Sequence, residues 1–174
     1  YSQNDNPTDV LRYTTNLRVS PSTTAIEREE IPGERDNWEI GGDYEHVADS
    51  GSRFKILFIS NRNDGASTRE RFDVFADGSE FKDIFLDLSS TTTERIVRAS
   101  YTMGFLEGQD IEFGAERAET TLDSSLSLGL PDDTGIPSPD FGGLVPQSVS
   151  NANSTVEEIR LEPFIIHNWI INSR

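Results

Sequence analysis

The sequence predicts an all-β fold, an antiparallel meander of hairpins, and two observations lead to this prediction. Apolar and polar residues alternate with a period of two over six segments, and no 3.6-residue helical period competes over a comparable length. Short, polar, Gly-containing stretches separate several of these segments, as in hairpin turns. We therefore expect strands that each have one apolar and one polar face.

The strands are read from the alternation itself. They cover residues 11–19, 38–45, 54–59, 97–105, 111–116 and 159–165. In one of them Val97, Tyr101 and Met103 fall on one face, and Arg98 falls on the other. Pro163 disturbs the last strand, because proline has no N–H to donate to a ladder and prefers an edge or a bulge.

The connections are of two kinds. Residues 48–52 and 106–110 are predicted hairpin turns. Three long stretches are rich in polar and turn-forming residues, and we expect long loops there: about 20–37, 62–93 and 123–154. In the middle stretch, a further hairpin around Asp77-Gly78 is an alternative. Short turns that alternate with long loops are typical of a transmembrane β-barrel, with small periplasmic turns and large outer loops.

The apolar stripe has two interpretations that alternation alone leaves open. Strands near ten residues, with charges on one side and aromatic or aliphatic residues on the other, suit the wall between lipid and a polar lumen in a large transmembrane β-barrel. In a soluble sandwich the same stripe would face a core. A turn begins at residues 171–174 without a following strand, so we expect residues 1–174 to be a fragment of one barrel domain.

Composition excludes several classes of function. The chain has 174 residues, with 15 Lys and Arg against 31 Asp and Glu, and a formal charge of −16. This balance argues against a nucleic-acid partner, which would need a basic face. The absence of cysteine excludes disulfides and thiolate chemistry. No apolar run approaches the length of a spanning helix, and residues 1–20 lack a signal-peptide pattern.

The sequence offers no pattern of catalytic or metal-ligating residues. His46 and His167 are isolated, and no nucleophile elbow, P-loop or dinucleotide fingerprint occurs. Carboxylate pairs such as Glu157-Glu158 are expected by chance in a chain with 31 acidic residues. We therefore expect a protein that is not an enzyme and that holds neither a metal nor a cofactor.

The stretch 123–154 contains the best candidates for contact with a ligand. It holds Asp132, Asp133, Asp140 and Phe141 beside the flexible pair Gly142-Gly143. Loops on rigid scaffolds carry binding residues disproportionately often. We take these four residues as candidate ligand contacts in an outer loop.

Specific segments resemble barrel hairpins of TonB-dependent outer-membrane receptors. Residues 37–45 read NWEIGGDYE and are followed by a short turn and RFKILF, and residues 94–101 read ERIVRASY before a turn and DIEFGAE. The resemblance covers roughly residues 37–62 and 94–171. It implies a barrel of about 22 strands with an N-terminal plug, to which this chain would contribute about six to eight strands and no plug.

The resemblance also implies a location and partners. The turns would be periplasmic and the long loops extracellular, in the bacterial outer membrane. The partners would be outer-membrane lipid, a small-molecule nutrient such as a siderophore or carbohydrate, and the TonB energy-transducing system, acting through a plug absent from this chain. The alternative is a soluble all-β binding module that recognises a carbohydrate or protein at the cell surface.

Overall fold

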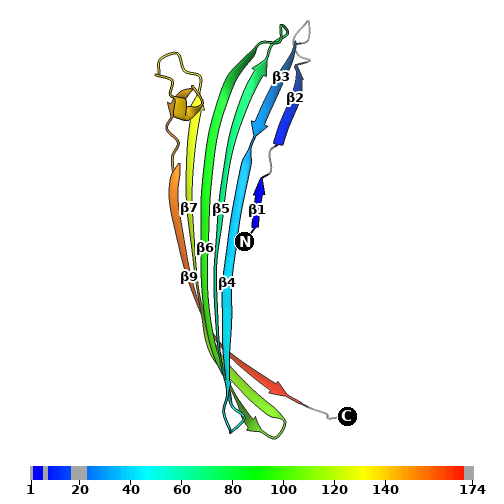
Figure 1. Ribbon diagram of the computed structural model, residues 1–174, viewed down its shortest axis with the longest axis vertical. Coiled ribbons are helices and arrows are strands. Elements are labelled where there is room, and N and C mark those ends of the chain that lie inside the picture. Colours follow the sequence, from blue (N-terminus) through cyan, green and yellow to red (C-terminus); the bar gives the residue numbers. More distant parts are fainter. Residues whose placement is uncertain (1, 6–7, 17–22, 171–174) are drawn as a thin grey trace. The chain divides into compact units, whose positions relative to one another are not determined.

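A computed structural model describes residues 2–5, 8–16 and 23–170, and their fold is all-β and antiparallel (Figure 1). The strands within these ranges are β1 (Ser2–Asp5), β2 (Thr8–Asn16), β3 (Thr23–Ile31), β4 (Gly33–Val47), β5 (Arg53–Val74), β6 (Glu80–Leu106), β7 (Gln109–Leu130), β8 (Val145–Gln147) and β9 (Asn153–Trp169). One short 3₁₀ helix, η1 (Pro139–Phe141), accompanies them, and no α-helix occurs in the described part of the chain.

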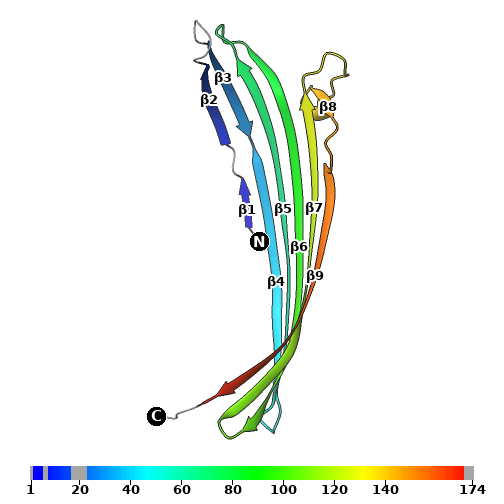
Figure 2. The same cartoon turned by 180° about the vertical axis from the view of Figure 1, so that it is seen from behind.

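The strands form one hydrogen-bonded sheet. Its order is β1-β4-β5-β6-β7-β8, with β3 paired to β2 and β5, and with β9 paired to β7. Figure 2 shows β8 beside the end of β7, where Leu128 lies opposite Gln147 and Leu130 lies opposite Val145. Among the described residues no pairing joins the two ends of this order, so the sheet is open.

The two predicted turns are confirmed, and the third hairpin around Asp77-Gly78 is also present. β4 and β5 are joined by a turn in which the Gly51 N–H donates to the Ala48 carbonyl at 2.8 Å. The Gly78 N–H donates to the Phe75 carbonyl at 2.9 Å. Gly51 and Gly78 both have φ of +83°, a left-handed conformation that glycine adopts without steric cost.

The six predicted strands are strands in the structure, within the described residues; residues 17–19 of the first lie outside them. The expected long loops are partly wrong. Residues 23–31 form β3, residues 33–37 begin β4, and residues 123–130 belong to β7. Of the stretch 62–93, all but the turn between β5 and β6 is strand.

The physical reason is that most of these strand segments mix charged and hydroxyl residues with a few apolar ones, such as Phe72, Val74 and Ile84, so that neither face is uniformly apolar. A period-two pattern is visible only where one face is apolar, whereas the added strand segments are held by ion pairs and hydrogen bonds between neighbouring side chains. A loop of the expected kind remains between β7 and β9, and it carries η1 and β8.

The chain divides into two compact units. Unit 1 comprises residues 1–37, 63–91 and 123–155, and unit 2 comprises residues 38–62, 92–122 and 156–174. The buried apolar side chains of the described residues are few: Leu144 and Val145 in unit 1 and Ala118 in unit 2. No helix in the described ranges is long and apolar enough to cross a membrane.

Candidate functional site

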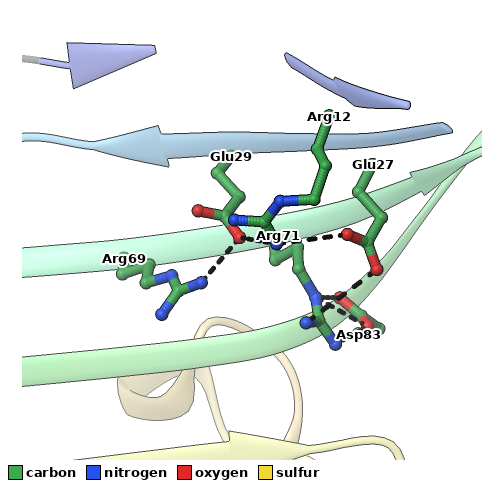
Figure 3. Close-up of polar contacts among 6 residues, drawn as sticks. All are labelled: Arg12, Glu27, Glu29, Arg69, Arg71 and Asp83. Carbon is green, nitrogen blue, oxygen red and sulfur yellow. Dashed lines mark hydrogen bonds and ion pairs between the residues drawn. The ribbon is translucent and has the colours of Figure 1, made fainter. Parts of the chain in front are cut away.

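Six charged side chains from four strands gather in unit 1 (Figure 3). We call them the charged cluster: Arg12 from β2, Glu27 and Glu29 from β3, Arg69 and Arg71 from β5, and Asp83 from β6.

The strand registers place the cluster on one face. Arg12 lies opposite Glu27 in the β2–β3 pair, and Glu29 lies opposite Arg71 in the β3–β5 pair. Opposite residues of an antiparallel pair share a face, as do residues two apart in one strand. Arg69 therefore projects to the same side as Arg71.

Glu29 is the buried centre of the cluster. Its side chain is only 3% exposed, and its carboxylate receives Arg69 Nη2 at 2.6 Å and Arg12 Nη1 at 3.4 Å. A buried carboxylate is costly unless it is paired and hydrogen-bonded. The two guanidinium groups therefore allow an acidic side chain to lie at this position.

Arg71 joins the cluster to β6. Its Nε donates to both Asp83 carboxylate oxygens, at 2.9 and 3.0 Å, and its Nη2 also donates to Oδ2, so two donor nitrogens engage one carboxylate as in a bidentate arginine–carboxylate pair. Its Nη1 lies 4.0 Å from a Glu27 oxygen. The hydrogen bond with Asp83 raises the pKa of Arg71, and the nearby Glu27 and Asp73 carboxylates add to this effect.

A second set of charges lies on the opposite face of β3 and β5. The Arg28 guanidinium lies 4.4 Å from the ring centre of Phe72, its partner in the register, in a cation–π contact. Arg28 also donates to the Glu80 carboxylate at 2.9 and 2.6 Å and pairs with Glu30. The hydrogen bond to Glu80 raises the pKa of Arg28 and lowers the pKa of Glu80.

Lys82 connects this second set to the loop after β7. Its ammonium donates to a Glu70 oxygen at 2.6 Å and to the Gly142 carbonyl at 3.1 Å. It also lies 5.4 Å from the ring centre of Phe72. One lysine therefore ties the β5–β6 hairpin to the loop that contains η1.

These contacts limit what the charged cluster can do chemically. Each guanidinium is engaged by a carboxylate, so the cluster neutralises itself and presents no free cation to an anionic ligand. Within the described ranges, no group of three or more His, Cys, Asp or Glu side chains has the geometry to hold a metal ion. The cross-strand ion pairs of the charged cluster hold β2, β3, β5 and β6 together and fix the positions of their charged side chains.

The four candidate ligand contacts lie in the loop between β7 and β9. Asp132 accepts hydrogen bonds from the Thr134 hydroxyl and N–H, both at 2.7 Å, and these lower the pKa of its carboxyl group. Asp133 and Asp140 are exposed, and Phe141 is partly buried in η1. η1 spans Pro139–Phe141, so it brings together two of the four candidates, Asp140 and Phe141.

This loop is packed more closely than its glycine and proline content predicts. A Cβ atom at Gly129 would lie 2.7 Å from the Phe141 carbonyl oxygen, and a Cβ atom at Gly142 would lie 2.5 Å from the Phe85 ring. Leu144 and Val145 are buried beside them. The glycines therefore allow close approach of the loop, in addition to the positive φ of Gly142.

Unit 2 is organised differently, with one largely apolar face and one face, called the polar face below, that carries the charges together with Leu57, Ile59, Phe164 and Ile166. Ion pairs and hydrogen bonds fix the polar face: Asp43 with Lys55, Asn61 with Glu94, and Glu116 with Arg160. Residues on the polar face therefore have odd numbers in β4 and β5 and even numbers in β6, β7 and β9, because side chains alternate along a strand. The rings of Tyr101 and Phe113 meet at 5.6 Å between centroids on the other face.

We call the other face the apolar face of unit 2. Large side chains of this face that are 38–78% exposed include Trp38, Ile40, Tyr44, Phe54, Ile56, Phe58, Val97, Met103, Phe105, Phe113, Ile159, Leu161 and Ile165. Soluble monomers rarely expose a contiguous apolar surface on this scale without a binding partner or a membrane against it. The apolar face is thus a surface that requires a covering medium or molecule.

The sequence reasoning missed the charged cluster. Its signal was present in two short runs, Glu-Arg-Glu-Glu at residues 27–30 and Arg-Glu-Arg at residues 69–71. Alternating signs in two runs predict cross-strand pairing only if the register is known. The register could not be read from the sequence, because neither run has an apolar face to fix it.

Comparisons with protein-family models, with curated proteins and with solved structures found no match for this chain.

Proposed function

We propose that this chain is a wall and outer-loop segment of a bacterial outer-membrane receptor, an antiparallel meander of hairpins within a large transmembrane β-barrel. The receptor takes up a small nutrient, such as a siderophore or a carbohydrate, with energy from the TonB system. The segment contributes structure and ligand contact and performs no catalysis. The observation that carries the proposal is the apolar face of unit 2.

The dimensions of unit 2 support a membrane-spanning role. Residues 38–47 of β4 and 53–62 of β5 give ten residues on each strand. At about 3.4 Å per residue and a tilt of about 45°, such strands rise about 25 Å, the height of the apolar band of an outer-membrane barrel. Trp38 and Tyr44 lie toward opposite ends of the β4 segment, as expected for aromatic girdles.

The polar face of unit 2 supports a lumen on the other side. It carries ion pairs: Lys55 Nζ lies 3.7 Å from Asp43 Oδ2 between two exposed side chains, and Arg160 Nη2 lies 3.2 Å from Oε1 of the half-buried Glu116. Such charges would be costly against lipid and cost little against water. Apolar-out and polar-in alternation is the pattern of a barrel with a wet interior.

Unit 1 fits the extracellular part of the proposed receptor. Its strands carry many charged side chains, held by the charged cluster and by the Arg28–Glu80 pair, beside apolar residues such as Leu11 and Tyr13. Strands of this kind suit a region beyond the lipid, where both faces meet water. The loop with Asp132 and Asp140 then belongs to the ligand-facing side of the receptor.

Cell fractionation tests the proposal. An antibody raised against residues 123–154 is used to follow the protein through separation of soluble, inner-membrane and outer-membrane fractions, with a carbonate wash to remove peripheral proteins. We expect a band in the washed outer-membrane fraction that detergent releases. A band in the soluble or secreted fraction would contradict the proposal and would favour the free-standing binding module.

A further inference from the structure

Unit 1 contains a hollow of about 450 Å³, bounded by residues of β2, β3, β4, β5 and β6. A volume of this size is in the range of pockets that take a small organic molecule. The lining combines three hydroxyl groups, two apolar side chains and one guanidinium group: Thr8, Ser67, Ser90, Ile31, Leu88 and Arg35. The hollow is therefore a second candidate ligand site, built on strands and separate from the loop after β7.

Glycines keep the space beside Arg35 open. A Cβ atom at Gly33 would lie 3.5 Å from the Ser67 Cβ atom, and a Cβ atom at Gly65 would lie 3.6 Å from Ser90 Oγ. Because β4 and β5 run antiparallel, two residues on from the Gly33–Ser67 neighbours Arg35 lies beside Gly65. The guanidinium of Arg35 thus has no β5 side chain directly across from it.

Arg35 is a cation without a counter-ion in the described part of unit 1. The other described Lys and Arg side chains of this unit each form an ion pair with a carboxylate: Arg12, Arg28, Arg69, Arg71 and Lys82. Among the described residues no carboxylate pairs with Arg35, although the chain has 31 acidic residues. Arg35 is exposed, and its register partner in β1 is Asn4. Its guanidinium is therefore available to an anionic ligand.

The charge around the hollow limits that ligand to few negative charges. Glu34 also lines the hollow, but neighbouring residues of a strand project to opposite faces, so its carboxylate does not lie on the face of Arg35. The whole chain has a formal charge of −16, which disfavours a polyanion. A single guanidinium in this setting selects a ligand with one anionic group.

The rest of the lining suits a carbohydrate. Each serine hydroxyl can both donate and accept a hydrogen bond, as ring hydroxyls of a sugar require. In the part of the chain that the structure describes, no hydrogen bond engages the hydroxyl of Ser67 or Ser90. Ile31 and the 39% exposed Leu88 add apolar surface, against which the C–H groups of a sugar ring can pack.

We propose that this hollow binds a small acidic carbohydrate, with the sugar carboxylate on Arg35 and ring hydroxyls on Ser67 and Ser90. A guanidinium holds a carboxylate through two parallel N–H···O hydrogen bonds, which fix the orientation of the ligand as well as its charge. The proposal rests on the proposed function and narrows the nutrient to one class, a sugar that carries a carboxylate.

Calorimetric titration of the whole receptor in detergent tests the ligand class. The probes are two acidic disaccharides, in which glucuronate or galacturonate is linked to a neutral sugar. We expect at least one to bind, and its methyl ester, which keeps the hydroxyls but lacks the charge, to bind about 10- to 100-fold more weakly. Absence of binding by both disaccharides, equal binding of the ester, or tighter binding of a glucose monophosphate would overturn the proposal.

Variants test the place of binding. Arg35→Gln should weaken binding of the acidic disaccharide by about as much as esterification does, and should leave binding of the ester unchanged. Arg53→Gln is the matched control, because Arg53 is an exposed arginine that pairs with Glu45 in unit 2, and it should change neither affinity. Gly65→Leu should weaken binding of both the acid and the ester, because it fills the space beside Arg35. Unchanged binding of the acid by Arg35→Gln would overturn the proposal.

These outcomes are distinguishable from failure of the proposed function. A protein that fractionates with the outer membrane but binds neither acidic disaccharide would overturn the ligand site alone. A soluble protein that binds an acidic disaccharide through Arg35 would overturn the receptor and would leave the ligand site in place.

Discussion

Replacing Arg69 with alanine removes the closer of the two guanidinium groups that hold the Glu29 carboxylate. In the variant, the carboxylate would keep only Arg12 Nη1, at 3.4 Å, while its side chain is 3% exposed. Water has little access to replace the lost donor. The β3–β5 pairing of unit 1 should therefore be weakened.

The expected cost is about 2 kcal/mol, which lies within the range for a buried charged group that loses a hydrogen-bond partner. It is lower than the 3–5 kcal/mol of a broken, fully buried ion pair, because Arg12 remains and Arg69 is itself 36% exposed. A loss of about 2 kcal/mol makes local opening about 30-fold more frequent. Amide hydrogen exchange of residues 27–31 should rise by this factor.

Arg53→Ala provides the matched control. Arg53 pairs with Glu45 at 3.5 Å, and the two side chains are 55% and 40% exposed. Exposed pairs of this kind contribute less than about 1 kcal/mol, so exchange near Arg53 should change by about twofold. If Arg69→Ala accelerates exchange in β3 no more than Arg53→Ala does in β5, the argument from the burial of Glu29 is wrong.

Three further predictions follow from individual contacts. Gly114→Val should destabilise unit 2 by about 2 kcal/mol or more, because a Cβ atom there would lie 2.6 Å from a ring carbon of Phe164, whereas Gly42→Ala, with nothing within 4 Å, should leave the thermal midpoint unchanged. The hydrogen bond from Arg28 makes the pKa of Glu80 lower in the folded chain than in an unfolded one. The stability that this ionised carboxylate contributes is therefore present above the unfolded pKa of about 4.3 and is lost as the pH falls through the folded pKa. Amide hydrogen exchange of unit 1, corrected for its intrinsic pH dependence, should show this loss between pH 7 and 3, and Glu80→Gln should make the loss smaller. Lys82→Met removes hydrogen bonds of 2.6 and 3.1 Å and should accelerate exchange in residues 139–144 severalfold, an outcome that unchanged exchange would contradict.

The part of the fold that could be predicted is the part with one apolar face. Alternation around Val97, Tyr101 and Met103 gave the correct strand, because apolar side chains repeat every second residue there. The turn with Gly51 was also predictable, since its left-handed conformation needs a residue without a side chain.

The part that could not be predicted depends on pairing between distant polar residues. β5 continues to Val74 and β6 begins at Glu80, and these extensions are held by contacts such as Arg71 with Asp83. Each residue alone is typical of a solvated loop. Only the register makes a cluster of them. The hairpin around Asp77-Gly78 indicated the β5–β6 pairing, whereas no local pattern specifies the β3–β5 pairing.

For the candidate ligand residues, the position of the loop was predictable from the sequence, but its packing was not. The sequence singled out the loop after β7, and a loop with η1 lies there. Its close packing was not predictable, because it depends on the ring of Phe85 and on Gly142, which are far apart in the sequence.

The most direct test of the proposed function is to measure whether lipid or water lies against the apolar face of unit 2. The chain has no cysteine of its own. In a receptor whose other cysteines are replaced by serine, single nitroxide labels can be attached at Ile40→Cys, Ile56→Cys and Val97→Cys on this face and at Glu39→Cys and Lys55→Cys on the other. In the receptor reconstituted in lipid vesicles, we expect the first three labels to collide with oxygen and not with a water-soluble nickel chelate, and the other two to collide with nickel. Nickel access on both faces, or an apolar face closed to both reagents as in a protein core, would contradict the account.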